Sequence, residues 1–179
     1  MQVSRKIIIE KSADEIWEIL ANQFVPVELW TASIKASSEI KTGTKAAGAP
    51  VVGRIAAIGP KAAKGASLKE VITLFDVANK RLVVDTDIIN MPGVNPMTGY
   101  TSDVQITPLS TNSCEVTWTS VAKLGFLGYI LYIPIRASLS NGFYRNLDEL
   151  KAIVETGNPH PRKQKAFEEF GLTAQLQSV

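Results

Sequence analysis

The chain has 179 residues, 45% hydrophobic and 20% charged, a composition typical of one globular domain. Its one cysteine and one histidine, Cys114 and His160, are too few for an internal disulfide or a Cys/His zinc site. The formal net charge of +2 is far below the dense positive charge that binding to a nucleic-acid backbone requires. We therefore expect no bound metal, no cofactor and no nucleic-acid partner.

The N-terminal segment predicts a strand followed by two short helices. Residues 1–10 contain only a short apolar run, which indicates a β-strand and no targeting signal, so we expect a cytoplasmic protein. The sequence SADE at residues 12–15 is a capping box and predicts a helix that ends near Asn22. Pro26 favours the first position of a second short helix through Trp30.

The middle of the chain predicts an antiparallel meander. After Trp30, apolar and polar residues alternate, with turn residues at intervals, and the expected strands are residues 33–40, 51–58, 67–76, 81–89, 100–108 and 114–122. Residues 90–99 contain two prolines and two glycines, so we expect a loop there and no regular strand ladder.

The last long element is helical. Apolar residues recur at spacings of four, four, three and four along one face of a helix expected from about Pro134 to Thr156, namely Leu139, Phe143, Leu147, Leu150 and Val154. Gly157 and Pro159 terminate this helix. Residues 157–179 are expected to form a short amphipathic helix followed by a disordered end.

This order of elements resembles the helix-grip fold of the START / Bet v 1 superfamily. Similar features are the capped helix with Trp17, the mid-sheet hairpin with Arg54 and Glu70, and the end of the long helix. The pattern over residues 3–155 is most like the polyketide cyclase/dehydrase and lipid-transport branch, although none of these motifs is a catalytic signature.

The resemblance implies an α+β fold that consists of one domain followed by a C-terminal tail. A seven-stranded curved antiparallel sheet would wrap around the long C-terminal helix, with two short helices after the first strand. Residues 1–156 would form the helix-grip ligand-binding domain, and residues 157–179 the tail.

A strongly twisted sheet is too wide for one helix to fill its concave face, so the fold predicts an internal cavity. Polar residues mark the outer face of the last two strands and leave Ser102, Val104, Trp118 and Ser120 on the inner face, with Tyr100 at the mouth. Such a cavity suits a hydrophobic or aromatic small molecule.

The register of the strand at residues 67–76 leaves two alternatives open. Glu70 faces the cavity if Ile72 does, and it then orients a ligand or acts as a general base, with Arg54 as a partner on the neighbouring strand. In the other register Glu70 is on the solvent side and Phe75 is inside. The expected ligand-binding residues are Trp118, Glu70, Tyr100, Ser102, Val104, Arg54, Ser120 and Phe143.

Several single residues have two interpretations. Trp118 is expected to line the cavity or simply to pack in the core. Trp17 is expected to be half exposed on its helix. Gly142, in the middle of a helix, indicates either close approach to the sheet or room for a ligand. Cys114 is expected to be an inert small hydrophobe, and His160 lies outside the cavity, which excludes a catalytic triad there.

Residues 124–135, from Leu124 to Ile135, form the longest apolar stretch, which is too short to span a membrane and contains Pro134. One interpretation is a buried lid that leads into the long helix. The other is an exposed apolar lip that makes transient contact with a membrane surface or a partner.

Three hypotheses on function follow. The first is a carrier or sequestering protein for a hydrophobic or aromatic molecule, lipid or polyketide-like. The second is a cyclase/dehydratase-type enzyme in which a cavity carboxylate or tyrosine transfers a proton. The third is a non-catalytic interaction module that uses the tail and the apolar lip. The sequence contains no glycine-rich nucleotide-binding motif. The ligand's identity and the oligomeric state stay open.

Overall fold

The computed structural model describes residues 1–59, 65–91, 93 and 95–170. These residues form one seven-stranded antiparallel sheet with the strand order β1-β7-β6-β5-β4-β3-β2. Its strands are β1 (Gln2–Ile9), β2 (Ile34–Glu39), β3 (Gly53–Ile58), β4 (Ser67–Asp76), β5 (Arg81–Ile89), β6 (Met97–Ser110) and β7 (Ser113–Leu124).

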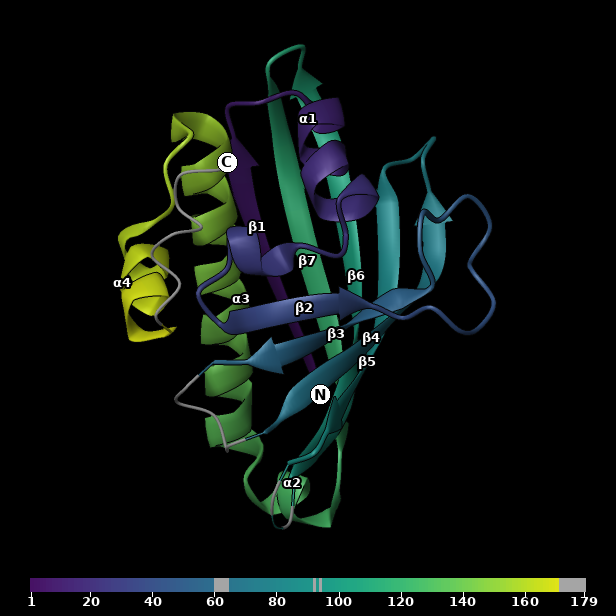
Figure 1. Cartoon of the computed structure of the whole chain (residues 1–179), viewed down its shortest axis with the longest axis vertical. Coiled ribbons are helices and arrows are strands. Elements are labelled where there is room, and N and C mark those ends of the chain that lie inside the picture. Colours follow the sequence, from purple (N-terminus) through teal and green to yellow (C-terminus); the bar gives the residue numbers. More distant parts are fainter. Residues whose placement is uncertain (60–64, 92, 94, 171–179) are drawn as a thin grey trace.

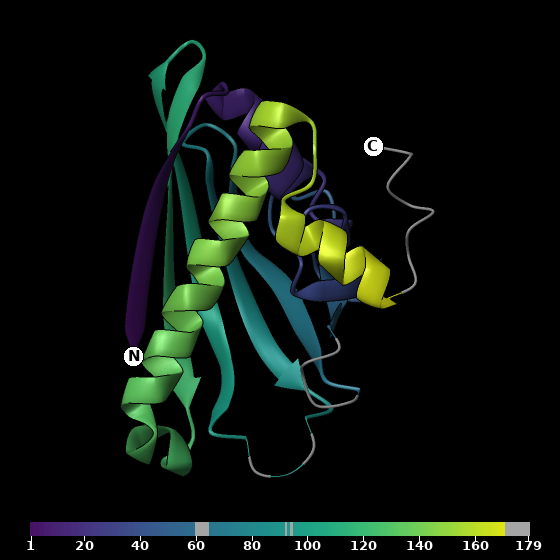
Figure 2. The ribbon, with the colours of Figure 1, turned by 90° about the vertical axis from the view of Figure 1, so that its left-hand side faces the viewer.

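Helices lie on one side of this sheet. The long helix α3 (Tyr132–Thr156) runs diagonally across its concave face, and α4 lies beside α3 (Figures 1 and 2). The remaining helical segments are α1 (Ala13–Trp17), η1 (Glu18–Asn22), η2 (Val27–Leu29), α2 (Phe126–Ile130) and α4 (Pro161–Phe170). This is the predicted helix-grip arrangement: a curved sheet, two short helical regions after its first strand and a long C-terminal helix.

The first helix begins at the predicted capping box. The backbone amide of Glu15 donates to Ser12 Oγ at 3.2 Å, and the Ser12 amide donates to Glu15 Oε2 at 3.0 Å. The helix continues from α1 into one wider π-helical turn, η1, and Pro26 precedes the 3₁₀ turn η2. The expected half-exposure of Trp17 is wrong, because its ring packs 4.9 Å from that of Phe75 and is 3% exposed.

The meander is confirmed, with one correction at the start of β6. This strand begins at Met97 and so extends into the segment that was expected to be a loop. Two features explain the difference. Pro96, which has no amide hydrogen, precedes the strand, and a side chain at Gly99 would place Cβ 2.1 Å from the carbonyl oxygen of Thr86. Glycine therefore permits pairing where another residue would prevent it.

A bulge in β4 resolves the two registers proposed for this strand. Its pairing with β5 shifts between Ile72 and Leu74. Glu70 and Ile72 therefore face inward on one side of the bulge, and Phe75 is buried on the other. Each alternative was correct for part of the strand.

The long helix follows the prediction. Phe143, Leu147 and Leu150 are buried on the inner face of α3, which ends at Gly157 with φ 71°. The tail forms α4, and the expected disordered end at residues 171–179 lies outside the described residues. Among the helices that the structure describes, none combines the length and apolar character needed to cross a membrane.

The apolar stretch at residues 124–135 is not the buried lid that one interpretation required. It forms β7's last residues, α2 and the start of α3, at the end of the molecule opposite the β6–β7 turn (Figure 1). Phe126 is 83% exposed and Ile133 is 79% exposed.

Candidate functional site

A row of polar side chains crosses the concave face of the sheet. Arg54 pairs with Glu70, Glu70 with Thr86, and Thr86 with Tyr100 in the registers of four successive strands, β3 to β6. Side chains at directly paired positions lie side by side on one face. Arg54, Glu70 and Thr86 are buried, and Tyr100 is partly buried. The sheet therefore carries a continuous polar strip across its concave face.

The predicted pairing of Arg54 with Glu70 is confirmed. Arg54 Nε donates to Glu70 Oε2 at 2.6 Å, and Arg54 Nη1 donates to the carbonyl oxygen of Phe24. The guanidinium also lies 4.1 Å from the centre of the Phe24 ring. The carboxylate of Glu70 is thus held by a buried cation, so ligand binding at this carboxylate would compete with an existing ion pair.

Next to this row, two polar atoms have no hydrogen-bond partner within the described part of the chain. They are Thr86 Oγ1 and Trp118 Nε1, both buried. The hydroxyls of Ser102 and Ser120, in contrast, bond to each other at 2.9 Å. Buried polar atoms without partners are rare in folded proteins. The indole N–H of Trp118 is therefore an available donor at the wall of the inner cavity, whereas the Thr86 hydroxyl lies next to that of Tyr100.

Three aromatic rings divide the space between sheet and helix. Phe143 of α3 contacts Tyr100 edge-on, with ring centres 5.7 Å apart, and lies 5.3 Å from Trp118. On one side is an outer cavity of about 390 Å³, lined mainly by apolar residues of β2 to β6 and α3. On the other side is a small inner cavity of about 30 Å³ beside the Arg54–Glu70 pair. The outer space is large enough for a small organic molecule, whereas the inner one holds about one water.

Seven of the eight predicted ligand-binding residues line these two cavities. Tyr100 and Phe143 line the outer cavity, and the inner cavity is lined by Arg54, Glu70, Ser102, Val104 and Trp118. Ser120 is completely buried and contacts Ser102 instead. Trp118 lines the inner cavity and also packs against the hydrophobic core, so neither of its two interpretations is excluded.

Sequence reasoning missed two residues of this region: Thr86, which is buried in the polar row but lines neither cavity, and a residue in the wall of the outer cavity. Thr86 alternates with Val84 and Ile88, which is the period-two signal of an inward position, but a lone threonine among apolar residues attracted no interpretation. Asn146 on α3 was also missed. Gly142 lines the outer cavity, and a Cβ built there would meet no atom within 4 Å, so this glycine provides room and not close approach.

Burial keeps two side chains in their protonated, neutral forms: the phenol of Tyr100 and the thiol of Cys114. It raises the pKa of Tyr100, and the nearby Glu70 carboxylate raises it further, so the phenol keeps its proton. Burial also raises the pKa of the Cys114 thiol to about 11, with Glu10 and Glu15 adding to the effect. Cys114 is therefore the inert residue that was expected. Over the residues that the structure describes, no three His, Cys, Asp or Glu side chains form a group that could hold a metal ion.

Comparisons with known proteins agree with this architecture. The profile of the family described as "Polyketide cyclase / dehydrase and lipid transport" matches residues 1–155. No curated protein matches the sequence significantly.

Three solved structures illustrate the likeness. The protein XoxI from Bacillus cereus is 18% identical, with a TM-score of 0.65 over 89% of this chain and 99% of its own. A START superfamily protein from Mycobacterium smegmatis is 14% identical, with a TM-score of 0.64 over 88% and 99%. Norcoclaurine synthase from Thalictrum flavum, solved with dopamine and hydroxybenzaldehyde, is 17% identical, with a TM-score of 0.59 over 89% of each chain. At these identities the likeness establishes the fold.

Proposed function

Because the chain belongs to the polyketide cyclase / dehydrase and lipid transport family, we propose that it carries or sequesters a hydrophobic or aromatic small molecule in the outer cavity. The observation that supports this most strongly is the space of about 390 Å³ between α3 and the sheet, in a place where most globular proteins are solidly packed. Apolar side chains make up most of its wall. Burial of the ligand's apolar surface would supply most of the affinity.

The inner end of the cavity favours a ligand with one polar end. Tyr100 and Phe143 present aromatic faces, and the indole nitrogen of Trp118 lies deeper, without a partner in the described residues. A carbonyl or hydroxyl oxygen on the ligand would accept a hydrogen bond from Trp118 once Phe143 moves aside. Such a contact would orient the molecule without requiring a charge.

A carrier accounts for Glu70 better than a catalyst does. A general base needs a carboxylate that is available to the substrate, but this one lies 2.6 Å from Arg54 Nε and is buried with it. The ion pair therefore has a structural explanation: it closes the inner end of the cavity.

Native mass spectrometry of the purified protein, followed by solvent extraction, tests the proposal. We expect an additional mass that is lost on extraction and is recovered as an apolar or aromatic compound. The variant Gly142→Phe, which fills the outer cavity, should lose this mass, whereas Tyr144→Ala, on the exposed side of α3, should retain it. Equal occupancy of the two variants would place the molecule outside the cavity and contradict the proposal.

The cyclase/dehydratase alternative rests on Tyr100. Its phenol is neutral and lies between Thr86 and the outer cavity, where it would donate a proton to a bound carbonyl or leaving hydroxyl. The variant Tyr100→Phe separates the two functions once a ligand is known. A carrier should keep most of its affinity, but an enzyme should lose turnover by roughly 100-fold or more.

A further inference from the structure

An apolar patch lies at the α2 end of the molecule. We define the apolar tip as Phe126, Tyr129, Ile130 and Ile133, which recur at helical spacing in α2 and the first turn of α3. Their exposed fractions are 83%, 72%, 67% and 79%. Single exposed apolar residues are ordinary, but four large ones grouped in eight consecutive positions mark an interaction surface.

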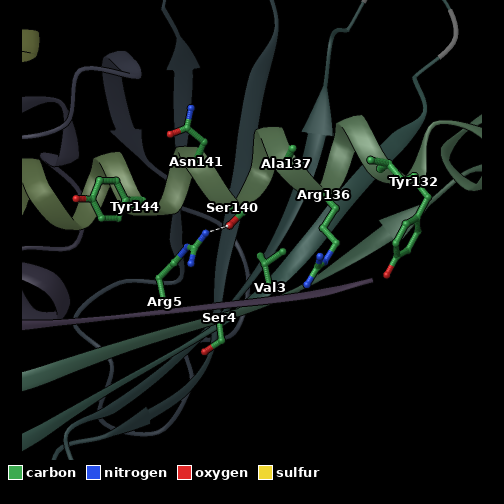
Figure 3. Close-up of a pocket in the computed structure, with 10 residues that line it drawn as sticks. Val3, Ser4, Arg5, Tyr132, Arg136, Ala137, Ser140, Asn141 and Tyr144 are labelled. Carbon is green, nitrogen blue, oxygen red and sulfur yellow. Dashed lines mark hydrogen bonds between the residues drawn. The ribbon is translucent and has the colours of Figure 1, made fainter.

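Beside the tip is a groove with basic walls. It has a volume of about 620 Å³ and lies between β1 and α3 (Figure 3). Arg136 projects into it from α3 and Arg5 from β1, and Arg5 donates a hydrogen bond to Ser140. Arg136 makes no ion pair with any residue in the described part of the chain. We call this the arginine groove; none of the residues that line it is acidic.

The sequence around the tip contains no acidic residue. Between Glu115 and Asp148 the sequence contains no acidic residue and three basic ones, Lys123, Arg136 and Arg145. Lys123 is paired with two carboxylates, Asp85 at 2.8 Å and Asp87 at 3.6 Å, so it adds no free positive charge beside the tip. The positive charge that complements an anionic partner is therefore that of the arginine groove.

The tip adjoins the mouth of the outer cavity. The amide of Gly125 donates to the carbonyl oxygen of Pro96 at 3.1 Å, and Pro96 also lines the outer cavity. In α3, Ile133 lines the arginine groove and Ile135 lines the cavity. The charged groove and the apolar cavity therefore lie on opposite faces of the first turn of α3.

We infer that the apolar tip and the arginine groove together dock this protein on an anionic phospholipid bilayer. The tip inserts among the acyl chains just below the headgroups, and Arg5 and Arg136 bind lipid phosphates. A second copy of the chain fits this surface less well. A two-fold contact would bring two arginine grooves together with no acidic residue between them. The inference does not depend on what the cavity holds.

Vesicle flotation tests this inference on the full chain. We expect the protein to float with phosphatidylcholine vesicles that contain about 30% phosphatidylglycerol, and to bind pure phosphatidylcholine vesicles far more weakly. Absence from the floating fraction at every phosphatidylglycerol content would overturn the inference. Ligand extraction is measured separately, so a failure here leaves the carrier proposal untouched, and the reverse also holds.

Two sets of variants separate the contribution of the apolar tip to vesicle binding from that of the arginine groove. Phe126→Ser with Ile133→Ser should abolish flotation, whereas Leu109→Ser, at an exposed site on the opposite end of the molecule, should not change it. Arg5→Gln with Arg136→Gln should weaken binding to the anionic vesicles about 30-fold, at a typical contribution per basic residue near a membrane. The charge-matched control is Lys35→Gln with Lys69→Gln, two exposed lysines on other strands.

Insertion depth gives an independent measurement. The native tryptophans lie outside the tip, so Phe126→Trp introduces a reporter there. We expect brominated lipids to quench its fluorescence, and circular dichroism of each variant checks that the fold is intact. If the arginine variants bind as tightly as the native chain, the groove has no role in docking. If the tip variants instead disrupt a dimer that forms without lipid, the surface belongs to a second copy; either result overturns the inference.

Discussion

The two ends of the space under α3 are built differently. At the inner end, Arg54 and Glu70 form a buried ion pair beneath Phe24 and Trp30, and only about 30 Å³ is left open. At the outer end, a cavity of about 390 Å³ leads toward α2, whose apolar side chains face solvent. The contrast fits a division of roles in which the inner end stabilises the fold and the outer end is the place where we propose that a ligand binds.

The largest expected effect is at the inner end. Glu70→Ala leaves the Arg54 guanidinium buried without its anion, and we expect a loss of about 3–5 kcal/mol in the free energy of unfolding. Urea denaturation measures this loss. The control is Asp103→Ala, which breaks the exposed pair with Arg81 and should leave stability unchanged within error. Equal effects of the two variants would show that the inner end has no special role in stability.

Removal of the aromatic partition should merge the two cavities. Phe143→Ala deletes the ring that contacts both Tyr100 and Trp118, at an expected cost of about 3 kcal/mol in stability. The enlarged space should accept bulkier apolar probes than the native protein does, as measured by fluorescence titration. A variant that loses stability but binds no larger probe would contradict the assignment of Phe143 as the boundary.

Helix α4, which packs beside α3, carries a buried lysine. Lys163 of α4 is completely buried, with its Nζ 4.1 Å from the centre of the Phe167 ring. Burial lowers the pKa of Lys163 from 10.5 to about 8, although Glu28 and Glu149 oppose the shift. The unfolded chain therefore binds more protons than the folded one between about pH 8 and 10.5, so stability should rise with pH across that interval.

Lys163→Met isolates this contribution. The variant should be more stable than the native protein near neutral pH, and the difference should shrink as pH rises above about 8. Urea denaturation of both proteins at several pH values measures the difference. A difference that is constant with pH would mean that Lys163 keeps its ordinary pKa in the folded state.

The smallest expected effect concerns Gly142 at the outer end. Gly142→Ala should stabilise α3 by up to about 1 kcal/mol, because a Cβ there meets no atom within 4 Å. The matched change Gly128→Ala should instead destabilise α2, since its Cβ would lie 2.2 Å from the Pro96 carbonyl oxygen. Thermal denaturation compares the two. A loss of stability in Gly142→Ala would show that the outer end is more tightly packed than the structure describes.

Local sequence patterns predicted most of the fold. The strands β4 and β5 begin and end at the predicted residues, because alternation and turn residues bound them clearly. The capping box at Ser12 and the C-cap at Gly157 were also correct. The site was found through the same alternation, which turns Ser102 and Trp118 inward.

The remaining features depend on contacts that no local pattern encodes. The bulge between Ile72 and Leu74 changes which residues face inward, and Trp17 is buried because that bulge turns Phe75 toward it. The exposure of Phe126 depends on how far α2 extends beyond the sheet. The partition by Phe143 exists only once the long helix is docked.

A final consequence concerns Glu149, on the side of α3 that faces α4. Its carboxylate accepts from the backbone amide of Ala32 at 2.8 Å and from Arg162 Nε at 2.9 Å. A proteolytic cut after Thr156 would remove Arg162 and leave a buried anion beside the segment that leads into β2. Removal of the residues after Thr156 should therefore destabilise the edge strand β2, even though the two segments are far apart in sequence.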